Sequence, residues 1–148
     1  MLFRCDDISL NTDILKLNNM ISLINEKFPK SNIMLGISPL IHDIKEEGLL
    51  KERIFPKIFN AFSDFKIFYK IDKCGIPNLD CFSAYNNIIL ASHGLIHVDH
   101  RLLAKEVQEL SIIASSSLVK SSIFIPPFNK WNKDTEEICK KNKIELIK

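Results

Sequence analysis

Six short runs of apolar residues recur along the chain, and none alternates between polar and apolar positions as a half-exposed strand does. Continuous runs of this length are typical of parallel strands that are buried on both faces of a sheet. The strands predicted in this way are residues 2–5, 32–38, 65–71, 88–91, 122–125 and 144–147.

Segments with helical periodicity separate these runs. Between the first two, apolar residues recur at helical spacing from Ile14 to Phe28; Thr12 is the predicted N-cap and Pro29 ends the helix. Further helices are predicted at residues 51–62 and 102–117 and, after a cap at Asp134 or Thr135, up to Lys141. Strands that alternate with helices predict right-handed βαβ units, and so an α/β fold with parallel strands and outer helices.

Length and charge narrow the class of protein. The chain has 148 residues, which fits a single domain spanning 1–148. Its 20 basic and 18 acidic residues leave a net charge of +2, too small for the basic face typical of nucleic-acid binding. No apolar run approaches the ~18 residues of a membrane span, and Asp6 and Asp7 stand where a signal peptide would be apolar. We therefore expect a cytoplasmic protein whose four cysteines are reduced.

Residues suited to catalysis follow the ends of the predicted strands. Asp6 and Asp7 come after the first strand, His42 follows the second, and three histidines lie between positions 93 and 100. In parallel α/β folds the chemistry lies at the carboxyl ends of the strands, so we expect these side chains to share one site. Two aspartates can also cap a turn, and a lone pair of histidines is weak evidence, but each alternative explains only its own residues.

His93 and His97 are the candidate metal ligands. Four positions apart on a helical turn, both imidazoles would face one ion. Asp7 would add a carboxylate, and this ligand set suits zinc, iron, cobalt or nickel, with positions left open for water. Neighbouring strand residues point to opposite faces, so Asp6 and Asp7 can both reach the site only where the strand is ending.

The order of these motifs resembles that of the polysaccharide deacetylase family, which is carbohydrate esterase family 4 or the NodB homology domain. Residues 3–7 are similar to its first motif, which ends in two aspartates after a strand. Residues 93–97 are similar to its His-Ser/Thr-x-x-His motif, with Gly94 at the Ser/Thr position. Residues 126–128 are similar to its Arg-Pro-Pro-aromatic motif, with Ile125 at the Arg position.

The stretches 93–103 and 126–132 most resemble deacetylase-like proteins of bacterial surface-glycan gene clusters. The resemblance implies a partial (β/α) barrel and hydrolysis of an N-acetyl group from an amino sugar of a surface polysaccharide or its precursor. The family's last two motifs are missing, so we expect a C-terminally truncated domain whose open sheet edge favours a homo-oligomer. The alternative is a non-catalytic deacetylase-like protein that binds metal or carbohydrate.

The resemblance also implies roles for single residues. Asp6 would be the general base. Asp7, His93 and His97 would hold one divalent metal, for which zinc is the first choice and iron, cobalt and nickel are the others. The backbone N–H of Phe128 would help to bind the oxyanion of the tetrahedral intermediate.

Four further residues are candidates for the acid or for substrate binding. His100 is a candidate acid because it lies three positions after the second histidine ligand; the alternative is a solvent-facing residue at the start of the long helix. His42 is a candidate for the acid or for contact with the substrate. Asn129 and Trp131 form a polar and aromatic loop beside the site, where Trp131 either stacks on a sugar ring or belongs to the core.

Overall fold

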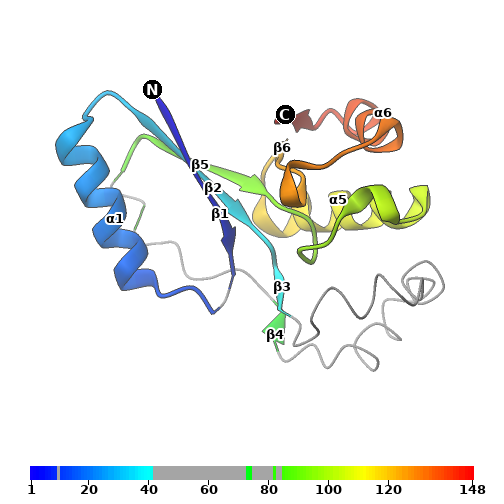
Figure 1. Ribbon diagram of the computed structural model, residues 1–148, viewed down its shortest axis with the longest axis horizontal. Coiled ribbons are helices and arrows are strands. Elements are labelled where there is room, and N and C mark those ends of the chain that lie inside the picture. The colour runs from blue at the N-terminus through cyan, green and yellow to red at the C-terminus, as the bar shows by residue number, and fades with distance from the viewer. Residues whose placement is uncertain (10, 42–72, 75–81, 83–84) are drawn as a thin grey trace.

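The computed structural model describes residues 1–9, 11–41, 73–74, 82 and 85–148 (Figure 1). A sheet of 5 parallel strands has the order β1-β2-β5-β6-β7. These strands are β1 (Leu2–Ile8), β2 (Asn32–Ile37), β5 (Ile88–Ser92), β6 (Ile123–Phe124) and β7 (Glu145–Leu146). A separate antiparallel pair consists of β3 (Leu40–Ile41) and β4 (Lys73–Cys74).

The helices lie between the strands, as the alternating pattern predicts. In the part of the chain that the structure describes they are α1 (Ile14–Lys27), α5 (Lys105–Val119) and α6 (Lys133–Lys141), with 3-10 turns η2 (His100–Leu102) and η3 (Pro127–Asn129). The predicted helix at 51–62 and strand at 65–71 lie outside the described residues. Within the described residues, no helix is long and apolar enough to cross a membrane.

Two N-caps differ from the prediction, and α5 begins at Lys105 rather than at residue 102. Asp13, not Thr12, caps α1, because its carboxylate accepts from the Lys16 backbone N–H at 3.1 Å while the Thr12 hydroxyl accepts from Ser9. Asn132 caps α6 in a capping box, in which the Thr135 side chain reaches back to the Asn132 N–H. Both shifts are explained by side-chain hydrogen bonds that the apolar periodicity does not reveal.

The three described helices cover one face of the sheet. Leu17 and Ile21 of α1 pack with Leu35 and other residues of β2, in a cluster that also includes Val119 of α5. A second cluster on this face joins α5, α6 and Phe124 of β6. Strand neighbours follow chain order, and right-handed crossovers between them place α1, α5 and α6 on the same side, as in the wall of a (β/α) barrel.

The opposite face of the sheet carries its own small cluster. Met34 of β2, Ala91 of β5 and Ile125, directly after β6, are buried there. The predicted α/β class with parallel strands and outer helices is therefore confirmed, and the sheet is consistent with part of a barrel. Among the described residues, β1 and β7 form its edges. The predicted partial barrel with an open sheet edge stays a prediction.

Candidate metal centre

A β-bulge at the end of β1 brings both aspartates to the site. Cys5 pairs with Leu35 and Ile8 pairs with Ile37, so β1 has one more residue than β2 over this stretch. Asp7 adopts the left-handed conformation with φ 63°, which is more accessible to Asp than to most residues. Because of the extra residue, Ile8 still returns to the core beneath α1.

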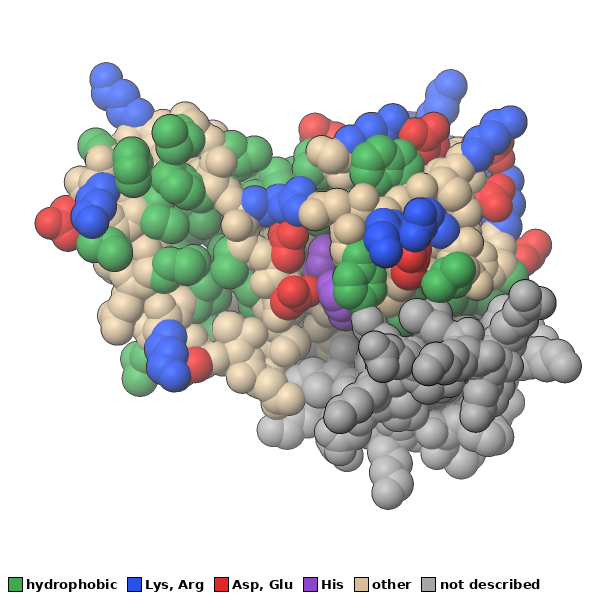
Figure 2. Space-filling view, in the orientation of Figure 1, with side chains coloured by type: hydrophobic (Ala, Val, Ile, Leu, Met, Phe, Trp, Pro, Cys, Tyr) green, Lys and Arg blue, Asp and Glu red, His purple; other side chains and the backbone are tan. Residues whose placement is uncertain are grey.

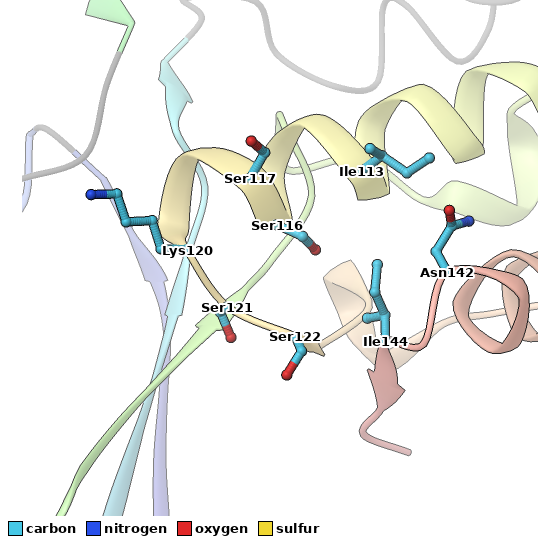
Figure 3. Close-up of a pocket in the computed structure, with 8 residues that line it drawn as sticks. All are labelled: Ile113, Ser116, Ser117, Lys120, Ser121, Ser122, Asn142 and Ile144. Carbon is cyan, nitrogen blue, oxygen red and sulfur yellow. The ribbon is translucent and has the colours of Figure 1, made fainter.

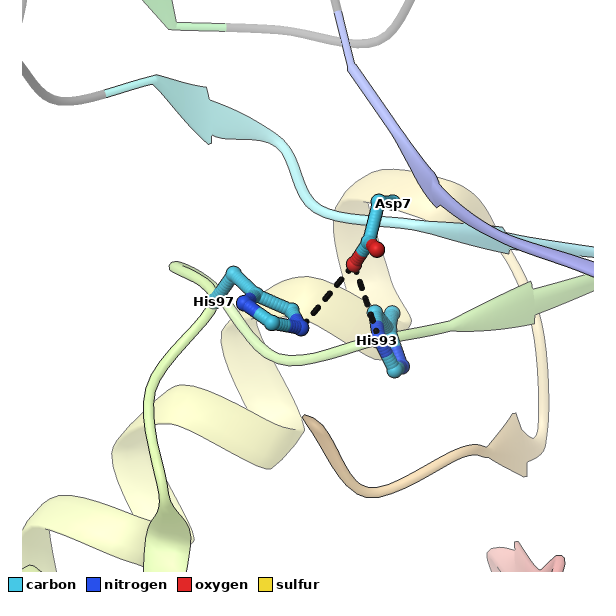
Figure 4. Close-up of side chains that lie close together, drawn as sticks. All are labelled: Asp7, His93 and His97. Atoms are coloured by element: carbon cyan, nitrogen blue, oxygen red, sulfur yellow. Dashed lines mark ion pairs between the residues drawn. The ribbon is translucent and has the colours of Figure 1, made fainter. Parts of the chain in front are cut away.

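Asp7, His93 and His97 come together at the carboxyl ends of β1 and β5 (Figure 4). Asp7 Oδ1 lies 3.3 Å from His93 Nε2 and 2.9 Å from His97 Nε2. The His93 side chain is 2% exposed, that of His97 29% and that of Asp7 67%. Figure 2 shows histidine side chains at the surface between acidic and hydrophobic ones, so the cluster opens on one side to solvent.

Backbone contacts fix the His93 ring and its tautomer. The ring Nδ1 lies 2.8 Å from the Ile125 carbonyl oxygen, which can only accept, so Nδ1 carries the proton. In the neutral ring, Nε2 is then left with its lone pair facing Asp7. The strand end is held further by Ser38, whose hydroxyl donates to the His93 carbonyl oxygen at 3.0 Å. A histidine oriented by a carbonyl in this way is typical of metal ligands.

The three side chains fit a divalent metal. Their ligand atoms all lie within 4.8 Å of one another. In a tetrahedral site with bonds of about 2.0–2.1 Å, ligand atoms lie roughly 3.3 Å apart, close to the spacings of Asp7 Oδ1 to the two rings. The His93 lone pair and the Asp7 carboxylate both need a cation or a proton between them. A zinc-type ion held by Asp7, His93 and His97 satisfies both acceptors.

Asp6 lies beside this cluster with one oxygen engaged and the other without a partner. Its Oδ2 is 3.0 Å from Arg4 Nη2, and the same nitrogen donates to Asn129 Oδ1. Its Oδ1 is buried without a hydrogen-bond partner among the described residues, over Gly36, where a Cβ would stand 2.9 Å away. A buried carboxylate oxygen left unsatisfied costs free energy and is therefore typical of a functional site.

The Phe128 ring packs against the ring of His97. The two rings have centroids 4.3 Å apart, and Phe128 remains 44% exposed. Phe128 and Asn129 both have left-handed backbones, with φ 57° and 55°. Strained non-glycine residues of this kind cluster at functional sites. The structure therefore brings the predicted oxyanion donor next to a candidate ligand, while its role in catalysis stays a prediction.

The segment that carries His93 and His97 is a bent loop, not the helical turn that their spacing suggested. Gly94 has φ +80°, and the His100 ring packs against it so closely that a Cβ at Gly94 would lie 2.8 Å from His100 Cε1. The hydroxyl of Ser111 accepts from the Leu95 backbone N–H at 3.0 Å and contacts His100 Nε2 at 3.1 Å. Together these contacts attach the loop to the buried side chains of Ser111 and His100.

His100 is fully buried, in contrast to the solvent-facing alternative. Its Nδ1 lies 3.0 Å from the Val98 carbonyl oxygen, and its ring meets Phe124 edge-on. Burial, with help from the nearby His93, lowers the pKa of His100 to about 4 despite the contact with Val98. A ring that is neutral near pH 7 and enclosed by the core favours a structural role over the predicted role as an acid.

The remaining predicted residues are only partly placed. His42 lies outside the described residues. Trp131 donates from Nε1 to Glu136 at 3.2 Å, and the Lys148 ammonium lies 5.9 Å from its ring. Its contacts are thus with α6 and the last residue of the chain, and sugar stacking stays a prediction. Arg4 was missed from the sequence, although a strand places residues two apart on one face, which makes it a neighbour of Asp6.

A second hollow lies at the far end of α5, before β6 (Figure 3). Its volume is about 500 Å³. It is lined by Ile113, Ser116, Ser117, Lys120, Ser121, Ser122, Asn142 and Ile144. Lys120 is the one charged side chain of this lining, which holds neither a carboxylate nor a histidine. The candidate chemistry therefore stays with the cluster at the carboxyl ends of the strands.

Comparison with known proteins supports the fold. No protein-family model matches the sequence, and no curated protein matches it either. Among solved structures, a CE4 family pseudoenzyme from Bacillus anthracis is similar, with a TM-score of 0.53 and 11% identity. The alignment covers 99% of this chain and 42% of that one, so the chain spans less than half of the solved protein. The likeness supports a fold of the polysaccharide deacetylase type.

Proposed function

We propose that this chain belongs to a metal-dependent hydrolase that removes an N-acetyl group from an amino sugar of a surface polysaccharide or its precursor. One observation carries the proposal: Asp7, His93 and His97 converge, and beside them the Asp6 carboxylate has a buried oxygen without a hydrogen-bond partner among the described residues. A metal-binding protein needs the three ligands but has no need for the second carboxylate, that of Asp6.

The residues divide the chemistry among them. Asp7, His93 and His97 would hold a zinc ion, which supplies a Lewis acid and lowers the pKa of bound water to about 7. Asp6, through Oδ1, would accept the proton of the attacking water as general base. The turn at Phe128 would bring a backbone N–H toward the oxygen that becomes negative. Ile125, through its carbonyl, keeps the His93 ring in the tautomer that binds metal.

The groups at the rim of the site are compatible with a sugar substrate. Phe128 offers an exposed apolar face, and Lys130 lies with its ammonium 5.8 Å from that ring. The amide of Asn129 stands on the same turn. An aromatic face beside polar groups suits a ring that has an apolar side and hydroxyls at its edge. We therefore propose an N-acetylated glycan or its precursor as the substrate, in line with the surface-glycan resemblance.

The second candidate is a non-catalytic deacetylase-like protein. The structural neighbour from Bacillus anthracis is itself a pseudoenzyme. The buried Ile125 stands where the resembled motif has arginine, which is consistent with a site that binds but does not react. This candidate retains the metal and the sugar, and it makes Asp6 dispensable.

Acetate release decides between the two candidates. The full-length protein, saturated with zinc or cobalt, is incubated with N-acetylated amino-sugar oligomers, and free acetate is measured. We expect turnover that falls on the order of 10²–10⁴-fold in Asp6→Asn, because general-base catalysis is lost while the ligands remain. Asp7→Asn is the matched neighbour, and we expect it to lose metal affinity first.

Two results would count against this proposal, the first against the role of Asp6 and the second against the enzyme itself. Equal acetate release by Asp6→Asn and the parent removes Asp6 from the mechanism. Absence of acetate from the metal-saturated parent on every N-acetylated glycan tried would favour the non-catalytic protein.

A further inference from the structure

Arg4 lies between the Asp6 carboxylate and the side chain of Asn129, and it contacts both. It lies two residues before Asp6, on the face of β1 opposite the helices. Its Nη2 lies 3.0 Å from Asp6 Oδ2, and the same nitrogen donates to Asn129 Oδ1. A guanidinium NH₂ group has two hydrogens, so one nitrogen satisfies both acceptors at once.

The geometry points to Arg4 as the residue that positions Asp6, an inference that rests on the proposed function. The terminal torsion of an aspartate is broad, so an untethered carboxylate can exchange its two oxygens and tilt. Arg4 holds Oδ2, and this leaves Oδ1 as the oxygen in the buried space over Gly36. The side chains are 27% and 22% exposed, so solvent competes only partly with the pair.

The contact with Asn129 extends this effect to the aromatic side of the site. Asn129 and Phe128 are consecutive residues in the left-handed conformation, and the Phe128 ring lies against His97. Arg4 thus connects the strand that carries the base to the turn that covers a metal ligand. Removal of the guanidinium would loosen the base and the turn together, while Asp7, His93 and His97 keep their own contacts.

The variants are Arg4→Ala and Arg4→Lys in the full-length protein. Arg101→Ala is the matched control, because it removes another Arg–Asp pair of two-residue spacing, the one between Arg101 and Asp99. Cobalt absorption reports the metal ligands. Carboxyl ¹³C NMR of labelled aspartates reports the carboxylates without any need for turnover, with Asp6→Asn used to assign the Asp6 signal.

We expect Arg4→Ala to keep the cobalt spectrum and to shift the Asp6 signal. Its kcat for acetate release should fall on the order of 10²-fold, because a displacement of about 1 Å at the base costs that much. KM should change far less. Added guanidinium ion should restore part of kcat in Arg4→Ala, and Arg4→Lys should lie between the two. Arg101→Ala should shift the Asp99 signal, leave that of Asp6 in place and keep kcat near that of the parent.

The outcomes separate this inference from the proposed function. A parent that releases no acetate refutes the function, and a shifted Asp6 signal in Arg4→Ala still supports positioning. A parent that is active while Arg4→Ala has the same kcat overturns positioning and keeps the function. An unmoved Asp6 signal overturns positioning in either case. If Arg4→Ala does not fold, the same measurements are made on Arg4→Lys. An unmoved Asp6 signal and an unchanged kcat in Arg4→Lys would then overturn the positioning role of Arg4.

Discussion

The Asp6 carboxylate lies directly over Gly36. A Cβ at Gly36 would stand 2.9 Å from Asp6 Oδ1 and 3.3 Å from Ile125 Cδ1, both closer than ordinary packing permits. Glycine at this point of β2 is therefore required by the position of a carboxylate on the neighbouring strand. The bulge of β1 and the absence of a side chain at Gly36 of β2 together leave room for the Asp6 carboxylate.

Gly36→Ala should displace the Asp6 carboxylate. We expect acetate release to fall roughly 10²-fold, as for a small misplacement of a catalytic group, and the free energy of unfolding to fall by about 1–3 kcal/mol from overpacking. Cobalt binding should remain, because the three atoms nearest to an added Cβ belong to Asp6 and Ile125 and not to a ligand. Met34→Leu, a volume-conserving change on the same face of β2, is the control. Full activity in Gly36→Ala would show that the space over Gly36 is not needed.

The metal cluster makes a direct prediction. The protein purified without chelators should hold about one divalent transition metal per chain, since a single three-ligand site is present in the described residues. His93→Ala should abolish binding because it removes the most buried ligand, and Asp6→Asn should retain it. Elemental analysis and cobalt titration measure both. A parent that takes up neither zinc nor cobalt would contradict the assignment of the ligands.

Gly94→Ser should harm the protein although it restores the serine of the resembled motif. At φ +80° a side chain is strained, and its Cβ would meet His100 Cε1 at 2.8 Å and the Ile96 carbonyl oxygen at 2.9 Å. We expect the free energy of unfolding to fall by about 2–4 kcal/mol and cobalt affinity to fall with it. Denaturant unfolding and cobalt titration test this. Unchanged stability would mean that the loop can rearrange without cost.

The stability of the fold should depend on the protonation of His100. Burial lowers its pKa to about 4 in the folded state, whereas the unfolded chain has the ordinary value near 6.5. Below pH 6.5 the unfolded state therefore binds a proton that the folded state does not, and stability is lost as the pH falls toward 4. The loss approaches roughly 3 kcal/mol for a shift of this size. Urea unfolding of the metal-free protein from pH 7.5 to 4.5 measures it.

His100→Gln is the variant that isolates this effect. Glutamine keeps a polar end group that can reach Ser111 but does not titrate. The variant should show a flatter dependence of stability on pH between 6.5 and 4 than the parent. An identical slope in the two proteins would assign the dependence to other groups.

The metal cluster could be predicted from the sequence because parallel strands end at one edge. Asp7 and His93 follow strands whose apolar runs are continuous, so their convergence needs only the order of the strands. The position of His100 could not be predicted, because it depends on Ser111 and on the left-handed backbone of Gly94, which pack together only in the folded protein. The bulge at Asp7 has no local signature either, since an extra residue is defined only against the partner strand.

The contact between Arg4 and Asp6 could be predicted from the sequence only in part. Alternation along a strand places the two on one face, which the sequence shows, but the strand was expected to end at Cys5. The structure continues β1 to Ile8, and Asp6 therefore lies within the strand rather than beyond it. Asn129, the other partner of Arg4, comes from a turn 125 residues away, which no local pattern indicates.

The bulge in β1 shifts the alternation of side chains by one residue, and the shift is confined to the segment between Cys5 and Ile8. Cys5 and Ile8 both pack on the helix side, so the inserted residue changes the phase of the side chains only where Asp6 and Asp7 stand. Hydrophobic residues on either side can therefore vary under the demands of packing without moving the two carboxylates. Loss of one residue here would leave Ile8 in phase with the core and remove an aspartate, so the chain could still fold while the chemistry disappeared. A single deletion at this point would thus keep the fold and remove one of the two carboxylates on which the proposed activity depends.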